Sequence, residues 1–161
     1  MSQGQFAIVD PEDYARLAQH KWHLAKCPTS SYAARWYRPR DGKHRKKIRM
    51  HHEVISVPRG MVCDHINGNG RDNRKANLRP ATISQNVCNR PKTKTKTRSK
   101  YKGLEWDKIQ RKWKVRIQLN GKKTYLGSFA SEIDAAKAYD HAAKKYHREF
   151  ARPNFDHQSV K

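Results

Sequence analysis

The chain has 161 residues, a length that fits one domain or two small ones. Its 36 lysines and arginines stand against 14 aspartates and glutamates, a formal net charge of +22. An excess of this size indicates an acidic polymer as partner, because neutralised phosphates release counterions and so drive binding. Four tryptophans, seven tyrosines and four phenylalanines argue against a wholly disordered basic chain, although composition leaves RNA and DNA both open.

Several classes of protein are excluded by what the sequence lacks. It has no run of about 18 apolar residues for a membrane span, and its N-terminus has neither the basic start nor the apolar block of a signal peptide. The three cysteines, Cys27, Cys63 and Cys88, are odd in number and not at CxxC spacing, which disfavours a disulfide framework or a cysteine-rich zinc site. We expect an intracellular, reducing location without membrane or small-molecule partners.

The N-terminal part shows short elements. Residues 5–9 (QFAIV) predict a strand, and Asp10 followed by Pro11 predicts a capped start for a helix over 11–19. Strands are expected at 22–24 and 32–34.

A basic stretch occupies residues 38–49, with a turn signal at Asp41–Gly42. We interpret it as a hairpin whose tip contacts phosphates, the alternative being a solvated loop. The residues that would make these contacts are Arg45, Lys46 and Lys47.

The segment from 50 to 89 has a more specific pattern. MHHEVI predicts a short helix or a strand end, MVCDH (61–65) a strand, and the Asn- and Gly-rich segment 66–77 an irregular loop, in which Arg71 and Arg74 are further candidate DNA contacts. LRPAT is a second strand, and Thr82 with Gln85 forms a capping box that opens a helix. The predicted order is strand, loop, strand, helix.

Residues 90–100 (RPKTKTKTRSK) predict an extended linker, since six of the eleven are basic and none is acidic. Such a segment either orders along a DNA groove or acts as a passive spacer. The candidate contacts are Arg90, Lys92, Lys94, Lys96 and Arg98.

A second unit is predicted from Tyr101. YKGLEW is a strand, residues 112–120 alternate strictly between apolar and polar side chains, and Asn120–Gly121 predicts a hairpin turn into the strand KKTYLGSF. Ser131 caps a helix over 132–147. The pattern predicts three antiparallel strands with one packed helix, and a core that includes Trp113, Leu126, Tyr139 and Phe155.

The residues able to do chemistry lie between 50 and 90. Asp64 and His65 end a strand, Asn77 ends the loop and Asn86 lies on the following helix. A carboxylate and an amide oxygen are hard ligands for a divalent ion, and an imidazole can accept a proton from an attacking water. The Asp–His pair alone is weak evidence, because such a pair more often forms a turn or a cap.

The segments DHINGN, DNRKANLR and ATISQN resemble the HNH nucleases, and most closely their phage- and intron-encoded homing endonucleases. The resemblance implies a ββα-metal fold in which Asp64 and Asn86 hold one Mg²⁺ or Mn²⁺ ion and His65 is the general base. Asn77 would fix the loop that orients His65, and His51 would support the site or contact a phosphate. The bacterial or phage-infected cytoplasm is the location it implies.

YKGLEW, KWKVRI, YLGSF, AAKAYDHAA and the final Asn–Phe resemble the plant Apetala/ethylene-response-factor DNA-binding domain, which reads the major groove with its sheet. Glu105 and Gln118 stand where those domains tend to carry Arg, so their base preference does not transfer. The positions that match are Lys102, Lys114, Arg116, Gln118, Lys123 and Tyr125.

We therefore predict an α+β protein in three parts: an N-terminal DNA-contacting segment with an HNH nuclease core (1–89, core 50–89), a basic linker (90–100) and a DNA-binding domain (101–157). It would hydrolyse phosphodiester bonds of double-stranded DNA at a specific site, as a monomer or a dimer. The alternatives are a non-catalytic DNA-binding regulator that retains an HNH fold and a structural RNA-binding protein.

Overall fold

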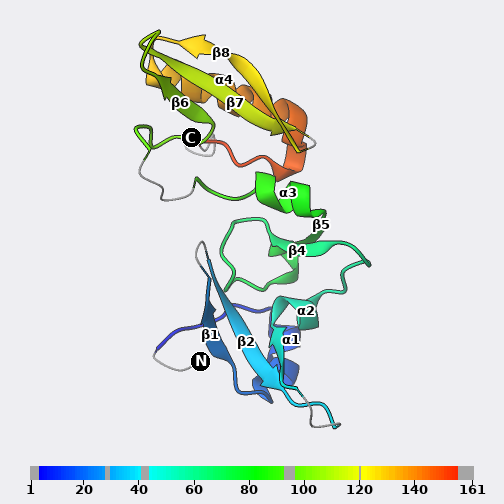
Figure 1. Ribbon diagram of the computed structural model, residues 1–161. Coiled ribbons are helices and arrows are strands. Elements are labelled where there is room, and N and C mark those ends of the chain that lie inside the picture. The colour runs from blue at the N-terminus through cyan, green and yellow to red at the C-terminus, as the bar shows by residue number, and fades with distance from the viewer. Residues whose placement is uncertain (1–3, 28–29, 41–43, 93–96, 120, 156–161) are drawn as a thin grey trace. The chain divides into compact units, whose positions relative to one another are not determined.

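The computed structural model describes residues 4–27, 30–40, 44–92, 97–119 and 121–155 (Figure 1). Its helices and antiparallel sheets confirm an α+β protein. The chain divides into two compact units, Met1–Ile83 and Ser84–Lys161. None of the helices that the structure describes is both long and apolar enough to cross a bilayer.

Helix α1 (Pro11–Ala18) begins where the sequence predicts, with Pro at its first position. The predicted strand at 5–9 is wrong: only Ile8 forms a bridge, parallel to Asp72. The Ile8 N–H donates to the carbonyl of Arg71, and the Ile8 carbonyl accepts from the N–H of Asn73. The N-terminal segment thus uses its backbone to hold a distant loop rather than to extend a sheet.

The first unit contains a three-stranded antiparallel sheet, formed by β1 (His23–Lys26), β2 (Ser31–Tyr37) and β3 (Lys46–Arg49) in that order. The predicted hairpin is confirmed as β2 and β3, while its turn at Asp41–Gly42 lies outside the described residues. One face of the sheet is closed by α1, because Ala33 packs with Leu17 and Met50.

The central segment contains α2 (His51–Val54), β4 (Val62–His65), the 3-10 turn η1 (Lys75–Asn77), β5 (Leu78–Ala81) and α3 (Ile83–Cys88). Strands β4 and β5 pair antiparallel. The predicted order of strand, loop, strand and helix is confirmed.

The second unit contains the sheet β6 (Leu104–Asp107), β7 (Lys112–Leu119) and β8 (Lys122–Phe129). Helix α4 (Glu132–His147) covers one face of it and is followed by the 3-10 turn η2 (Arg148–Phe150) (Figure 1). The Ser131 hydroxyl accepts the N–H of Asp134 at 3.3 Å, which confirms the predicted cap.

The core of this unit also agrees with the sequence pattern. Trp113, Val115 and Ile117 are buried on the inner face of β7, with Tyr139 and small alanines of α4 against them. Leu126 and Phe155 pack at the edge of the same cluster, as predicted. Only glycine fits at Gly103, because its φ is +84° and an added Cβ would lie 2.0 Å from the Tyr139 ring.

The division between the units falls at the first residue of α3, whereas the sequence suggests a boundary at 90–100. Helix α3 is tied to the second unit, because the Lys102 ammonium donates to the carbonyls of Cys88 and Arg90 at 2.7 and 2.8 Å. Ser99 is buried, so the end of the predicted linker also packs into the second unit.

Candidate active site

Asp64 and His65 end strand β4 and are both buried. The β4–β5 register places Asp64 opposite Arg79 and His65 opposite Leu78. The Nε of Arg79 donates to Oδ2 of Asp64 at 2.9 Å, and Nη2 of the same guanidinium lies 2.9 Å from that oxygen as an ion pair. A strand end and its cross-strand neighbour therefore hold the Asp64 carboxylate in one orientation.

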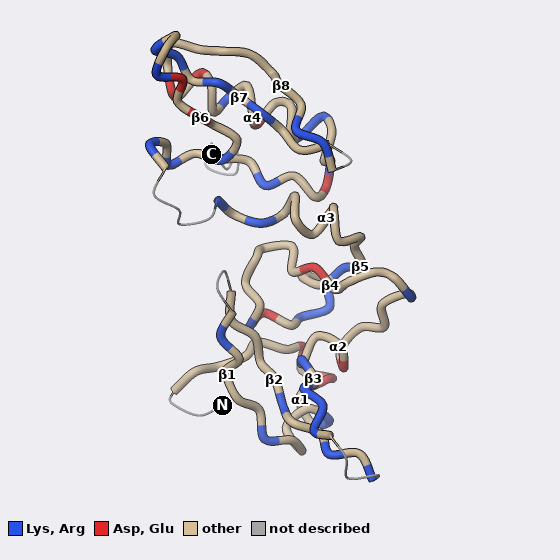
Figure 2. The backbone as a smooth tube through the Cα atoms, in the orientation of Figure 1, with Lys and Arg blue, Asp and Glu red and all other residues tan. Residues whose placement is uncertain are grey.

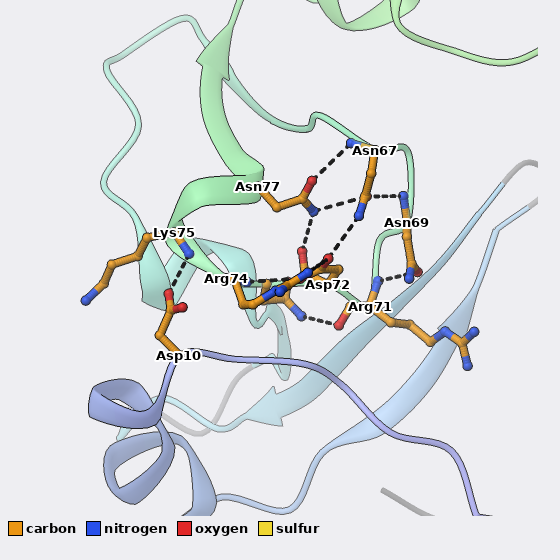
Figure 3. Close-up of polar contacts among 9 residues, drawn as sticks. Asp10, Asn67, Asn69, Arg71, Asp72, Arg74, Lys75 and Asn77 are labelled. Atoms are coloured by element: carbon orange, nitrogen blue, oxygen red, sulfur yellow. Dashed lines mark hydrogen bonds and ion pairs between the residues drawn. The ribbon is translucent and has the colours of Figure 1, made fainter. Parts of the chain in front are cut away.

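The loop 66–77 is closed by a hydrogen-bond network around Asp72 and Asn77 (Figure 3). The Asn77 amide donates to the Asp72 carbonyl at 2.7 Å and to Oδ1 of Asn67 at 3.1 Å, and its own oxygen accepts the Asn67 N–H. Asn77 is buried and connects both ends of the loop that begins after His65.

Asp72 is the charged centre of this loop. Its buried carboxylate accepts from Asn67 Nδ2 at 2.9 Å and from Nε and Nη2 of Arg74 at 2.9 and 2.8 Å (Figure 3). The hydrogen bonds from Arg74 are the main reason why the pKa of Asp72 is held below its ordinary value. The loop is therefore built around a carboxylate that stays ionised at neutral pH.

The protonation pattern of His65 depends on its neighbour Asn73. Nε2 of His65 lies 3.3 Å from Oδ1 of Asn73, whose amide nitrogen donates to the carbonyl of Arg71 at 3.1 Å. That second bond fixes which amide atom faces His65, so Nε2 must donate. In the neutral ring, Nδ1 then carries the lone pair. Burial lowers the pKa of His65, which favours this neutral form.

His51 and Tyr32 pack against His65. Ring centroids lie 5.0 Å apart for His51 and His65 and 5.8 Å apart for Tyr32 and His65. Burial, followed by the nearby His65, lowers the pKa of His51 to about 3. Nδ1 of His51 is buried without a hydrogen-bond partner in the described part of the chain, which is unusual for a buried polar atom.

Gly70 explains how the loop approaches the sheet so closely. A Cβ at this position would lie 2.6 Å from the Ser31 carbonyl oxygen and from the Tyr32 ring. Backbone cannot yield as a flexible side chain does, so any larger residue would separate the loop from β2.

The donor chemistry near Asp64 suits a hard divalent cation. The contacts of Arg79 fall on Oδ2, and a carboxylate oxygen is a hard ligand of the kind that such a cation prefers. Asn86, the second predicted ligand, is half-buried on α3 and belongs to the second unit.

The predicted DNA contacts of the first unit fall into two groups. Arg71 and Arg74 have partners within the fold, Gln5 and Asp72 respectively. Arg45, Lys46 and Lys47 are exposed at and beside β3, where Figure 2 shows basic residues in succession.

The predicted contacts of the second unit also differ among themselves. Lys114 and Arg116 pair with Asp107 and Glu105, while Gln118, Lys123 and Tyr125 are exposed. Lys102 departs from the expectation of an exposed contact, because its ammonium caps the end of α3 and burial lowers its pKa to about 8.

The linker candidates also occupy different environments. Lys92 donates to the Tyr101 carbonyl, the Arg98 guanidinium lies 4.3 Å from the Trp106 ring centroid, and Arg90 is exposed. Lys94 and Lys96 lie outside the described residues.

Three residues that hold the site were not singled out from the sequence: Asp72, Asn73 and Arg79. Asp72 is the one acidic residue in the loop 66–77 and stands among arginines, a charge pattern that predicts an internal ion pair. Arg79 could be found by aligning the two strands, since it falls opposite Asp64. The contact of Asn73 with His65 has no comparable signal in the sequence.

The segment that forms this candidate site matches a known protein family. The model of a family described as HNH endonuclease matches residues 42–88, the segment that contains the buried histidines and the asparagine-rich loop. The chain is 30% identical over 158 residues to an uncharacterized HNH endonuclease of Acanthamoeba polyphaga mimivirus, a match that covers 94% of the chain and 75% of the relative.

Two other relatives cover less of the chain. Protein 3.8 of Escherichia phage T7 is 30% identical over 96 residues, 60% of the chain and 78% of its own length. APETALA2-like protein 2 of rice is 45% identical over 60 residues, 36% of the chain and 14% of the plant protein. The match to the mimivirus protein extends over nearly the whole sequence, and on that ground the chain belongs to the HNH endonuclease family.

Proposed function

We propose that the protein is a metal-dependent DNA endonuclease of the homing type, in which His65 is the general base. The observation that carries this proposal is the fixed orientation of His65: Nε2 donates to Asn73, so the basic lone pair of the ring is on Nδ1. An imidazole with its lone pair on Nδ1 has the protonation pattern that a general base requires when water attacks a phosphodiester.

Asn77 and His51 are proposed as positioning residues. Asn77 closes the loop that carries Asn73, and its loss would let the partner of His65 move. His51 is proposed to support the His65 ring or to contact a phosphate, and the packing of the two rings at 5.0 Å supports the first of these roles.

The proposed metal ligands are Asp64 and Asn86, with Mg²⁺ or Mn²⁺ as the ion. When bound, such an ion would stabilise the negative charge that grows on the scissile phosphate and on the leaving oxygen. Arg79 keeps the Asp64 carboxylate oriented before any ion binds.

Affinity for the target is proposed to come from the exposed face of β7 and β8, where Gln118, Lys123 and Tyr125 are accessible to DNA. Arg116 is exposed on the same face and would contact DNA if it left its ion pair with Glu105. The partial similarity to APETALA2-like protein 2 supports this assignment. Linking a binding sheet to a nuclease site raises the local concentration of target DNA at that site.

Cleavage of a supercoiled plasmid by wild type and His65→Ala in Mg²⁺, Mn²⁺ or EDTA tests the proposal. The plasmid should contain DNA from the neighbourhood of the gene. We expect metal-dependent nicking or linearisation by wild type, and loss of cleavage with retained DNA binding for His65→Ala. Tight binding without cleavage in any metal would instead indicate a DNA-binding regulator, and equal loss of binding and cleavage would make His65 structural.

A further inference from the structure

The β1–β2–β3 sheet has one face opposite α1, on which Ala34 is buried while Trp36, Lys47 and Arg49 are exposed. Residues paired across antiparallel strands point to the same face, so the pairs Trp36–Lys47, Ala34–Arg49 and Ala34–His23 define it. Ala33 packs with Leu17 and Met50 on the other face. We call His23, Tyr32, Trp36, Lys47 and Arg49 the aromatic–cationic strip.

The side chains of this strip contact one another. The Lys47 ammonium lies 5.1 Å from the Trp36 ring centroid, and the His23 ring is nearly parallel to Trp36 at 6.2 Å with an interplanar angle of 14°. The Arg49 guanidinium lies 5.1 Å from the Tyr32 ring centroid. Aromatic and cationic groups therefore alternate along one surface.

The Trp36 side chain is accessible, with 54% of the residue's surface exposed, and Lys47 and Arg49 are exposed as well. Figure 2 shows that basic residues succeed one another along β3, next to this face. What distinguishes Trp36 from other exposed apolar residues is its position beside exposed cations, a combination that suits a ligand with both flat rings and negative charges.

The end of the strip at Tyr32 adjoins the candidate active site. The Tyr32 ring lies 5.8 Å from the His65 ring, and Gly70 brings the loop 66–77 into contact with β2. Tyr32 and Trp36 are four residues apart on β2, about 13 Å along a strand. A chain of nucleotides that lies on the strip would thus approach the loop 66–77 and the end of β2 that packs on His65.

We propose that the aromatic–cationic strip binds an unpaired, single-stranded stretch of the DNA substrate beside the cleaved bond, with Trp36 stacking on a base. This inference rests on the proposed nuclease function. A positively charged surface with aromatic platforms is what single-stranded nucleic acid requires, because every base has a face to stack and every phosphate a charge to neutralise. In a fully paired duplex the base faces are stacked on one another and are not available to Trp36. Such a duplex would therefore be bound by the cations of the strip alone.

The roles within the strip differ. Lys47 and Arg49 would neutralise phosphates, and each would contribute about one unit to the salt dependence of binding. Trp36 would contribute to the free energy of binding by stacking, a contribution that salt does not screen. The two contributions can therefore be separated by substituting one residue at a time.

Binding is measured in EDTA, so that no cleavage occurs, with three fluorescent DNAs of one sequence: a single strand, a fully paired duplex and a duplex with a two-nucleotide bulge. The variants are Trp36→Ala, Trp36→Phe and Tyr14→Ala. Tyr14 is a matched control because it is an exposed aromatic on α1, which packs on the opposite face of the sheet. Thermal unfolding of each variant checks that the fold is intact.

We expect Trp36→Ala to weaken binding of the single strand and of the bulged duplex roughly 5- to 150-fold, and to change binding of the paired duplex less than about twofold. Trp36→Phe should retain most of the affinity, and Tyr14→Ala all of it. Equal loss on all three DNAs would make the strip a duplex contact, and no loss on any would leave it without a role in binding. Either result overturns the proposal.

This test is independent of the nuclease assignment, because it needs neither metal nor turnover. If neither wild type nor His65→Ala cleaves DNA while Trp36→Ala still loses single-strand binding, the proposed nuclease function is wrong. The strip is then a single-strand binding surface without a cleaved bond beside it. If cleavage depends on His65 and Trp36→Ala binds all three DNAs normally, the nuclease function is supported and the proposal that the strip binds single-stranded DNA is wrong.

Discussion

Substitution of Asp72 should unfold the first unit at a lower denaturant concentration without touching the residues proposed to react. The carboxylate accepts three side-chain hydrogen bonds of 2.8 to 2.9 Å, two from Arg74 and one from Asn67. Hydrogen bonds to a charged group contribute about 1.5–3 kcal/mol when buried, but the Arg74 side chain is 51% exposed, so about 1 kcal/mol for each bond is the better figure.

Asp72→Ala should therefore lower the free energy of unfolding by about 3 kcal/mol. Asp72→Asn keeps one acceptor oxygen but loses the charge, and it should lower this free energy by about 1.5 kcal/mol. Urea unfolding followed by circular dichroism measures both, and Asn69→Ala in the same loop is the control, since Asn69 makes only exposed contacts among those that the structure records.

The pH dependence gives a second check. The pKa of Asp72 is lowered in the folded protein, chiefly by Arg74, so its ionised form stabilises the fold above the ordinary carboxyl pKa of about 4. That stabilisation is lost as the pH falls through the lowered pKa. The difference between wild type and Asp72→Ala should be constant from about pH 5 to 8 and shrink below about pH 4. A difference under about 0.5 kcal/mol at pH 7, or one that persists unchanged at pH 3, would refute the reasoning.

Three further predictions concern the second unit and DNA binding. Gly103→Ala should destabilise the second unit by about 3 kcal/mol in urea unfolding, because φ is +84° and the new Cβ would lie 2.0 Å from the Tyr139 ring; a loss below about 1 kcal/mol would show that the ring moves freely. Lys102→Met should cost about 1–2 kcal/mol through the lost bonds to Cys88 and Arg90, yet leave the salt dependence of DNA affinity unchanged; a slope smaller by about one would place Lys102 on a phosphate. For wild type, log K against log salt should have a slope of about −6 to −9 if seven to ten phosphates are neutralised, whereas a slope near −2 would show that the two units do not bind together.

The regular elements could be predicted because local signals agree with packing. Helix α4 has a serine cap and an alanine face, and β7 alternates strictly, so their bounds can be read from the sequence. Residues 5–9 have strand-like composition, but Ile8 is used for a single bridge to Asp72, a tertiary contact that no local pattern encodes.

The residues of the candidate site also fall into those that the sequence predicts and those that only the fold reveals. Asp64, His65 and Asn77 stand out by residue type and spacing, and the structure brings the loop of Asn77 onto the end of β4. The partners that hold them, Asn73 and Arg79, are 8 and 15 residues from the groups they contact, and they depend on the loop conformation and the strand register. A lysine at position 102 is expected from the sequence to be an exposed DNA contact, but its long side chain folds back onto the end of α3.

The roles of Asp64 and His65 can be tested together by measuring Mn²⁺ binding and DNA cleavage on one preparation each of wild type, Asp64→Ala and His65→Ala. Electron paramagnetic resonance of Mn²⁺ counts bound ions in the presence of target DNA, and plasmid cleavage is measured in parallel. With Asp64 as a metal ligand and His65 as the general base, the proposed mechanism predicts that wild type binds the ion and cuts, that His65→Ala binds the ion but does not cut, and that Asp64→Ala does neither. Cleavage by wild type in EDTA, or full activity of Asp64→Ala in Mn²⁺, would contradict it.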